Sequence, residues 1–111
     1  MVRMPSYLVQ FSYTEEAVAH LVHHPQNRIE AVRPAFEEAG VTIRDSWLAF
    51  GDYDVILVIE APGNVEAAAI AMAVTAGRAV RNYKTTPLMT WEEGVEAMRT
   101  AGGSAYQPPS S

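Results

Sequence analysis

With 111 residues, 49% of them hydrophobic and 19% charged, the chain has the composition of one globular domain, and its lack of cysteine excludes disulfide scaffolds, zinc–thiolate centres and thiol nucleophiles. The net charge of −5, without any basic run, argues against binding to nucleic acid, and no apolar run reaches the roughly 20 residues of a membrane span. These bounds predict a soluble cytoplasmic protein that binds neither nucleic acid nor a membrane.

The chain opens with a strand followed by a helix. Residues 6–13 are dense in β-branched and aromatic types, which favour a strand. Thr14 then offers an N-cap oxygen, and the two glutamates after it suit the positive end of a helix that runs to about His23.

A second helical piece is predicted over about residues 26–39. Pro25 can open it, and apolar residues recur within it at helical spacing. Pro34 lies inside this piece and is expected to kink it, because proline lacks a backbone donor. Gly40 is the expected C-terminal stop.

A hairpin is predicted next, with strands over residues 41–50 and 54–61. Gly51 and Asp52 lie between the strands, with glycine in the first central position that a type II′ turn requires. The pattern therefore predicts positive φ at Gly51.

The second half repeats the order of helix and strand. Asn64 is expected to cap a helix that ends near Gly77, and residues 81–89 to form a strand that Pro87 places at the sheet edge. Thr90 and Glu93 form a capping box before a short helix that ends at Gly102 and Gly103.

This order predicts an α+β, ferredoxin-like βαββαβ sandwich with antiparallel sheet order 4-1-3-2 and an extra C-terminal helix. Residues 1–103 would form the single domain and residues 104–111 a flexible tail. Both main helices are expected on one face of the sheet. Because the strand over 54–61 is apolar on both of its faces, the uncovered face predicts a homodimer or a higher oligomer.

Four segments carry a resemblance to a known family: PSYLVQFSYTEEAV, PQNRIEAVRPAFEEAGVTI, FGDYDVILVIEAP and AAAIAMAVTAGRAVRNYKTTPLMTWEEG. They resemble the GYD-domain family, named for the residues that here are Gly51, Tyr53 and Asp54, over about residues 4–95. The family is similar to the dimeric α/β-barrel proteins, so the resemblance implies a ferredoxin-like dimer, and it implies no particular activity. Pro34 departs from the family pattern, in which a helix former is expected.

The predicted hairpin carries the first catalytic candidates. Asp52, Tyr53 and Asp54 place two carboxylates and a phenol together, which suits general acid–base chemistry. Turn chemistry offers the structural alternative, in which Asp52 favours the turn and Asp54 accepts hydrogen bonds from turn amides.

The histidines are the second set of candidates. Glu16, His20 and His24 recur every four residues on one helical face, a spacing that suits zinc, another divalent ion or haem, and His20 is also a candidate for catalysis. His23 completes an HxxHH motif. Favourable contact with the helix dipole explains the same residues without any ligand, so no cofactor is expected.

Aromatic and polar strand residues are candidates for ligand binding. Trp47, Tyr83 and Trp91 could line an aromatic pocket, or they could serve as core or interface anchors. Gln10 and Ser12 are polar positions within a strand that could line a polar cleft.

Three classes of function remain open at this level. The first is a small oligomeric domain that binds a small molecule or acts as an accessory protein, since no residue breaks the local folding rules. The second is a cofactor-independent oxygenase or isomerase acting on a small organic substrate, which rests on the resemblance. The third is a metal or haem protein that uses the histidines.

Overall fold

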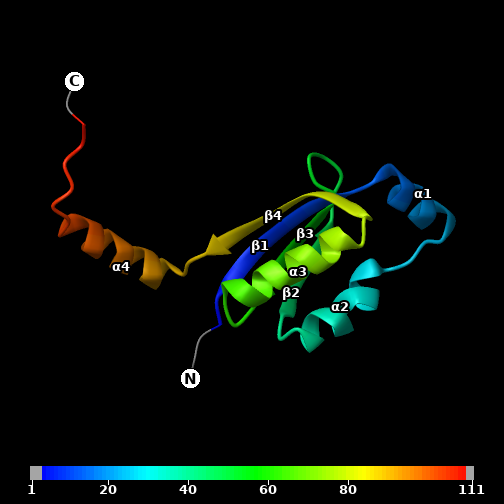
Figure 1. Ribbon diagram of the computed structural model, residues 1–111, viewed down its shortest axis with the longest axis horizontal. Helices are drawn as coiled ribbons and strands as arrows, with labels where there is room; N and C mark the ends of the chain where they lie inside the picture. Colours follow the sequence, from blue (N-terminus) through cyan, green and yellow to red (C-terminus); the bar gives the residue numbers. More distant parts are fainter. Residues whose placement is uncertain (1–3, 110–111) are drawn as a thin grey trace.

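The computed structural model describes residues 4–109, which form one four-stranded antiparallel sheet and four helices (Figure 1). The sheet order is β2-β3-β1-β4, which is the predicted order read from the other edge. The α+β, ferredoxin-like fold with its extra C-terminal helix is therefore confirmed. In chain order the elements are β1 (Ser6–Tyr13), α1 (Glu15–His23), α2 (Arg28–Glu38), β2 (Thr42–Leu48), β3 (Val55–Glu60), α3 (Asn64–Ala76), β4 (Val80–Leu88) and α4 (Trp91–Gly102).

Local signals predicted from the sequence start α1 and α4 and stop α2. Thr14 Oγ1 accepts a hydrogen bond from the N–H of Ala17 at 3.2 Å. Thr90 Oγ1 accepts from the Glu93 N–H at 3.1 Å, while the Glu93 carboxylate accepts from the Thr90 N–H at 2.9 Å. Gly40 follows α2 with a φ of 82°, the left-handed conformation that favours glycine at a helix end.

The starts of α2 and α3 differ from the prediction. α2 begins at Arg28 rather than beside Pro25, because the side chain of Asn27 accepts hydrogen bonds from the first free N–H groups of the helix. Asn64 is the first residue of α3 and not its cap. Its Oδ1 accepts a hydrogen bond from the Tyr7 hydroxyl at 2.8 Å, which ties α3 to β1.

The core lies on the face of the sheet that α2 and α3 cover (Figure 1). Alternate strand residues point to it, and Val9, Leu57 and Ile59 are at most 1% exposed. α2 adds Phe36 to this cluster and α3 adds Ile70. The prediction that both main helices lie on one face is therefore confirmed.

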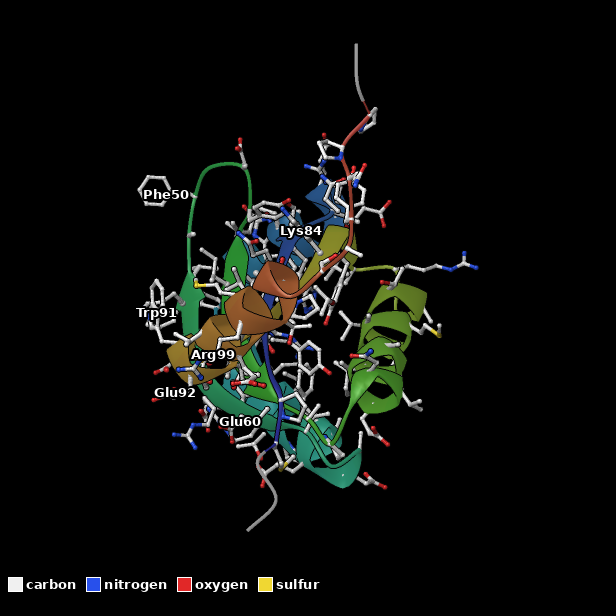
Figure 2. The ribbon with its side chains drawn as sticks, turned by 90° about the vertical axis from the view of Figure 1, so that its left-hand side faces the viewer. Phe50, Glu60, Lys84, Trp91, Glu92 and Arg99 are labelled. Atoms are coloured by element: carbon white, nitrogen blue, oxygen red, sulfur yellow. The ribbon has the colours of Figure 1, made fainter. Side chains whose placement is uncertain are left out.

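The opposite face of the sheet is open. The strand register places Leu8 beside Val58 and Gln10 beside Ile56 on this face. These side chains are half-buried by their neighbours, although no helix within residues 4–109 lies over them (Figure 2). Apolar side chains without a covering layer are typical of a surface that binds a partner.

The connection between β2 and β3 is a loop over residues 49–54, so the predicted type II′ turn is wrong. Gly51 does not have positive φ, and a Cβ atom added to it would meet nothing within 4 Å. The loop is closed at its base by the hydrogen bond from the Ala49 N–H to the Asp54 carbonyl, and it also bonds to β1. The Asp54 N–H donates to the Phe11 carbonyl at 2.9 Å, and Ser12 Oγ donates to the Asp52 carbonyl at 3.1 Å.

α4 lies beyond the end of β4, away from the sheet and the other helices (Figure 1). None of its residues is buried. Residues 104–109 have no regular secondary structure, and residues 110–111 of the predicted tail, like residues 1–3 of the predicted domain, lie outside the described residues. Within the described chain, no helix combines the length and hydropathy needed to cross a membrane.

Candidate functional site

Tyr13 ends β1 at the margin of the core. Its ring lies edge-on to the ring of Phe11, with centroids 6.0 Å apart and an interplanar angle of 83°. The Tyr13 backbone N–H donates to Asp54 Oδ2 at 2.8 Å. These contacts hold the side chain in place, while its hydroxyl makes no hydrogen bond to another described residue.

Two surface hollows meet at Tyr13. The first, of about 460 Å³, lies between the α1–α2 connection and the end of β2, and the second, of about 480 Å³, lies beside α1 and the residues that precede β4. Both are open to solvent, and both have volumes in the range of small-molecule sites. We call the two hollows together the Tyr13 cleft; the residues that line both are Tyr13, Leu21, Gln26 and Arg28.

Arg28 supplies a positive charge to this cleft. Its Nη1 donates to Gln26 Oε1 at 3.1 Å, and Gln26 Nε2 donates to the His24 carbonyl at 3.2 Å. The guanidinium forms no ion pair with a carboxylate in the part of the chain that the structure describes. An oriented cation without a partner is a suitable group for binding an anion.

The Tyr13 hydroxyl remains protonated at neutral pH. Burial raises the pKa of Tyr13 above its ordinary value of 10.0, Arg28 opposes this shift, and the Asp54 carboxylate adds to it. A protonated hydroxyl beside a guanidinium gives the cleft two donors of different kinds. Together they can bind a carboxylate, a phosphate or a carbonyl oxygen.

Asp54 of the GYD motif and its neighbour Asp52 stabilise the backbone around this site. The Asp54 carboxylate accepts from the Tyr13 N–H, and its backbone carbonyl accepts from the Ala49 N–H at 2.7 Å. Asp52 contributes its carbonyl to Ser12, while its side chain is exposed. These contacts support a structural role for the Asp54 carboxylate, which positions the end of β1, whereas Asp52 contributes only its backbone carbonyl.

Tyr53 lies apart from the Tyr13 cleft. It is half-buried and lines another hollow together with Asp52 and three residues of β4. The predicted trio of Asp52, Tyr53 and Asp54 is thus not assembled around the cleft.

The candidate metal ligands lie on α1. The rings of His20 and His24 are 4.7 Å apart, and both residues are exposed, as is Glu16. His20 and Glu16 line the second hollow of the Tyr13 cleft, whereas His24 does not line either hollow. Within residues 4–109 no group of three or more potential ligand side chains is arranged to hold a metal ion.

The predicted aromatic pocket does not form. Trp47 lines the first hollow and is 56% exposed, whereas Trp91 lies on α4 and is 82% exposed, so neither tryptophan belongs to the core. Tyr83 instead packs on the core, parallel to the ring of Phe11 with centroids 5.5 Å apart.

The predicted polar positions of β1 separate as well. Gln10 lies on the open face beside Ile56 of β3 and Lys84 of β4. Ser12 is buried under the loop over residues 49–54. The two side chains therefore do not line one cleft.

The sequence interpretation missed the residues that define the cleft. Tyr13 and Arg28 belong to no motif, and they come together only because the chain turns back between α1 and α2. One signal was present: Tyr13 follows Tyr7, Val9 and Phe11 on the buried side of β1 but stands at the strand end, where a polar hydroxyl reaches the surface.

Tyr83 leads to the first prediction. Its hydroxyl is buried and has no hydrogen-bond partner within the described chain, so Tyr83→Phe is expected to raise the free energy of unfolding by up to about 1 kcal/mol. Burial also raises the pKa of Tyr83 to about 12 from 10.0. The unfolded chain then ionises first, so stability is complete below pH 10 and falls as the pH rises toward 12.

Urea unfolding of Tyr83→Phe and the original protein between pH 7 and 11.5 checks this prediction. The variant should lose less stability in the alkaline range. A loss above about 1 kcal/mol at pH 7 would instead indicate that the hydroxyl is hydrogen-bonded.

The comparisons with known proteins give a family and nothing narrower. The model of the GYD domain matches residues 7–98. No curated protein and no solved structure matches the chain. The match includes Gly51, Tyr53 and Asp54, together with both strands that Asp54 connects. The chain therefore belongs to the GYD-domain family.

Proposed function

We propose that the protein is a homo-oligomeric domain that binds a small organic anion in the Tyr13 cleft. The observation that carries this proposal is that Tyr13 and Arg28, whose guanidinium forms no ion pair among the described residues, together line the junction of the two hollows. The Tyr13 hydroxyl has no hydrogen-bond partner among the described residues, and the Arg28 guanidinium has only the exposed Gln26 side chain, so both remain available to a ligand.

The lining of the first hollow supports a ligand with an apolar body. Ile29, Leu48 and Val55 line it, and Pro25 lies among the same lining residues. A planar or branched hydrocarbon fits such a surface, while its carboxylate or phosphate meets Arg28 at the rim.

Benzoate and phenyl phosphate are suitable probes, with benzamide as a neutral analogue of similar shape. Isothermal titration is expected to detect saturable binding of one anionic probe per chain and weaker binding of benzamide. Arg28→Gln should weaken binding of the anion about tenfold or more, since a hydrogen bond to a charged group contributes about 1.5–3 kcal/mol.

Arg44→Gln is the matched control, because this substitution removes the same charge from a residue of β2 that lines neither hollow. Equal affinity for benzoate and benzamide, or equal effects of the two arginine substitutions, would contradict the proposal. So would the absence of saturable binding by both anions.

Homo-oligomerisation is proposed through the open face of the sheet. Leu8, Ile56 and Val58 lie in adjacent strands on this face, which has no helical cover in the described chain. Pairing two such faces about a two-fold axis removes both from water and gives a closed assembly.

A cofactor-independent enzyme is the second candidate function. The observation that favours it is that His20 and Glu16 line the same hollow as Tyr13, which brings three titratable groups to one small cleft. His20→Ala tests the enzyme: it should abolish turnover of a substrate, whereas the affinity for benzoate should change less than in Arg28→Gln, because His20 does not line the first hollow, in which the apolar body of the probe is proposed to lie.

A further inference from the structure

α4 is an amphipathic helix whose apolar side has no partner among residues 4–109, the part of the chain that the structure describes. Trp91, Val95 and Met98 recur at the spacing of one helix face and are 82%, 39% and 62% exposed. Thr100 and Glu96 lie on the opposite side, and no residue of the helix is buried. A helix of this pattern is normally stabilised by packing its apolar side against another surface.

A second exposed apolar pair lies at the diagonally opposite corner of the sheet. α4 follows β4, an edge strand, at the end where Leu88 lies opposite Ser6. Trp47 is the penultimate residue of β2, the other edge strand, at the far end of the sheet, and Phe50 lies in the loop that follows. Phe50 is 100% exposed.

Both corners present their aromatic side chains on the same side of the molecule. Figure 2 shows Phe50 and Trp91 projecting to the side away from α3, which is the side of the open sheet face. Trp47 lies opposite Ile56 on β3 and therefore also belongs to the open face. The two corners and the open face thus form one discontinuous surface, in which these apolar side chains lie among polar ones such as Gln10 and Lys84.

Two-fold symmetry relates such corners to each other. Consider the diagonal of one sheet that runs from its α4 corner to its Trp47–Phe50 corner. A two-fold axis that lies between two facing sheets and is perpendicular to this diagonal places the α4 corner of each copy over the Trp47–Phe50 corner of the other. The strands of the two sheets then cross at a steep angle, as in orthogonal sheet packing. A single symmetric dimer would therefore cover the α4 corner and the Trp47–Phe50 corner of both copies.

The area of the open face supports this arrangement. With strands about 4.8 Å apart and a rise of about 3.3 Å per residue, pairing two such faces buries roughly 900 Å². Stable interfaces begin at about 1,200 Å². Docking both copies of α4, each about 18 Å long and about 10 Å wide, adds roughly 700 Å² and brings the interface to the standard size.

We propose that α4 is an exchanged arm, which packs Trp91, Val95 and Met98 on Trp47 and Phe50 of a second copy of this chain. The inference rests on the sheet-to-sheet pairing proposed above and adds the element that completes it. It explains why a helix with an intact capping box and a full apolar side extends away from its own domain.

Site-directed cross-linking tests the arm, because the chain has no cysteine of its own. Chains carrying Met98→Cys and chains carrying Phe50→Cys are mixed, allowed to exchange subunits, and oxidised. A disulfide that joins the two different chains is expected, with a yield at least tenfold above that of Thr100→Cys mixed with Phe50→Cys. Thr100 lies on the opposite side of α4 and serves as the matched control.

The second measurement is the dimer dissociation constant. Trp91→Glu combined with Met98→Glu should raise it at least tenfold, and Thr100→Glu should leave it within twofold. Circular dichroism confirms that the domain remains folded, since α4 contributes no buried residue to the core.

The outcomes separate the two proposals. A dimer by light scattering that gives no Met98→Cys to Phe50→Cys disulfide overturns the exchanged arm and leaves the sheet pairing in place. A separate chain that carries both Met98→Cys and Phe50→Cys is oxidised as well. If a disulfide forms within this single chain and none joins different chains, α4 folds back on its own sheet, which also overturns the arm. A monomer at micromolar concentration overturns both proposals.

Discussion

Val58→Asp is expected to give a folded monomer. Val58 lies on β3 between Leu57 and Ile59, which are buried under the helices, so its own side chain points to the open face. A carboxylate there remains in water in the single chain, but in a face-to-face dimer it would be buried opposite an apolar surface. Burying an unpaired carboxylate, or protonating it to avoid burying the charge, costs free energy in both copies, so the dimer should dissociate.

Ile59→Asp is the matched control, one residue further along the same strand. Ile59 is 0% exposed, so the same substitution places the carboxylate in the core and should unfold the chain, with a loss of more than about 4 kcal/mol. Light scattering across a dilution series and circular dichroism distinguish the two effects. A Val58→Asp variant that keeps the mass of a dimer would show that the open face is not the interface, and an unfolded Val58→Asp variant would contradict the orientation of the strand.

The architecture was predictable because its signals are local. The strands carry period-two patterns, Thr14 and Thr90 supply cap oxygens, and Gly40 ends α2. Right-handed crossovers then leave one sheet order for two interleaved βαβ units. α2 continues through Pro34, the residue that departs from the family pattern, and Phe36, two residues later, still packs in the core.

The loop over residues 49–54 could not be predicted in the same way. Gly51 and Asp52 are typical of a tight hairpin turn, but hydrogen bonds to β1, far away in the sequence, determine the backbone here. The candidate site could not be predicted from the sequence for the same reason. Tyr13 and Arg28 are separated by α1 and the connection that follows it, so only the folded chain brings them to one cleft.

The location of the tryptophans could not be predicted for a related reason. Large aromatic residues in a small domain are usually core or interface anchors, and the structure excludes only the core: Trp47 and Trp91 are exposed because the open face and α4 have no covering layer among residues 4–109. Both tryptophans are exposed in a single chain, and the cross-linking and dilution experiments test whether a second copy covers them.

Asp54→Ala is expected to lower the free energy of unfolding by about 1–3 kcal/mol, because it leaves the Tyr13 N–H without its partner at the end of β1. The same hydrogen bond orients Tyr13, so the variant should also weaken the binding of benzoate. Asp54→Asn keeps an oxygen that can accept the hydrogen bond, and should recover most of both losses.

Asp52→Ala provides the control within the same loop. Only the backbone carbonyl of Asp52 is hydrogen-bonded, to Ser12, and its side chain is exposed, so this substitution should change stability by less than about 0.5 kcal/mol. Urea unfolding of the three variants, with benzoate titration of each, measures both effects. Equal losses for Asp52→Ala and Asp54→Ala would contradict the assignment. A loss of binding in Asp54→Ala without a loss of stability would instead indicate that the Asp54 carboxylate contacts the ligand itself, and that the motif for which the family is named acts in the cleft directly.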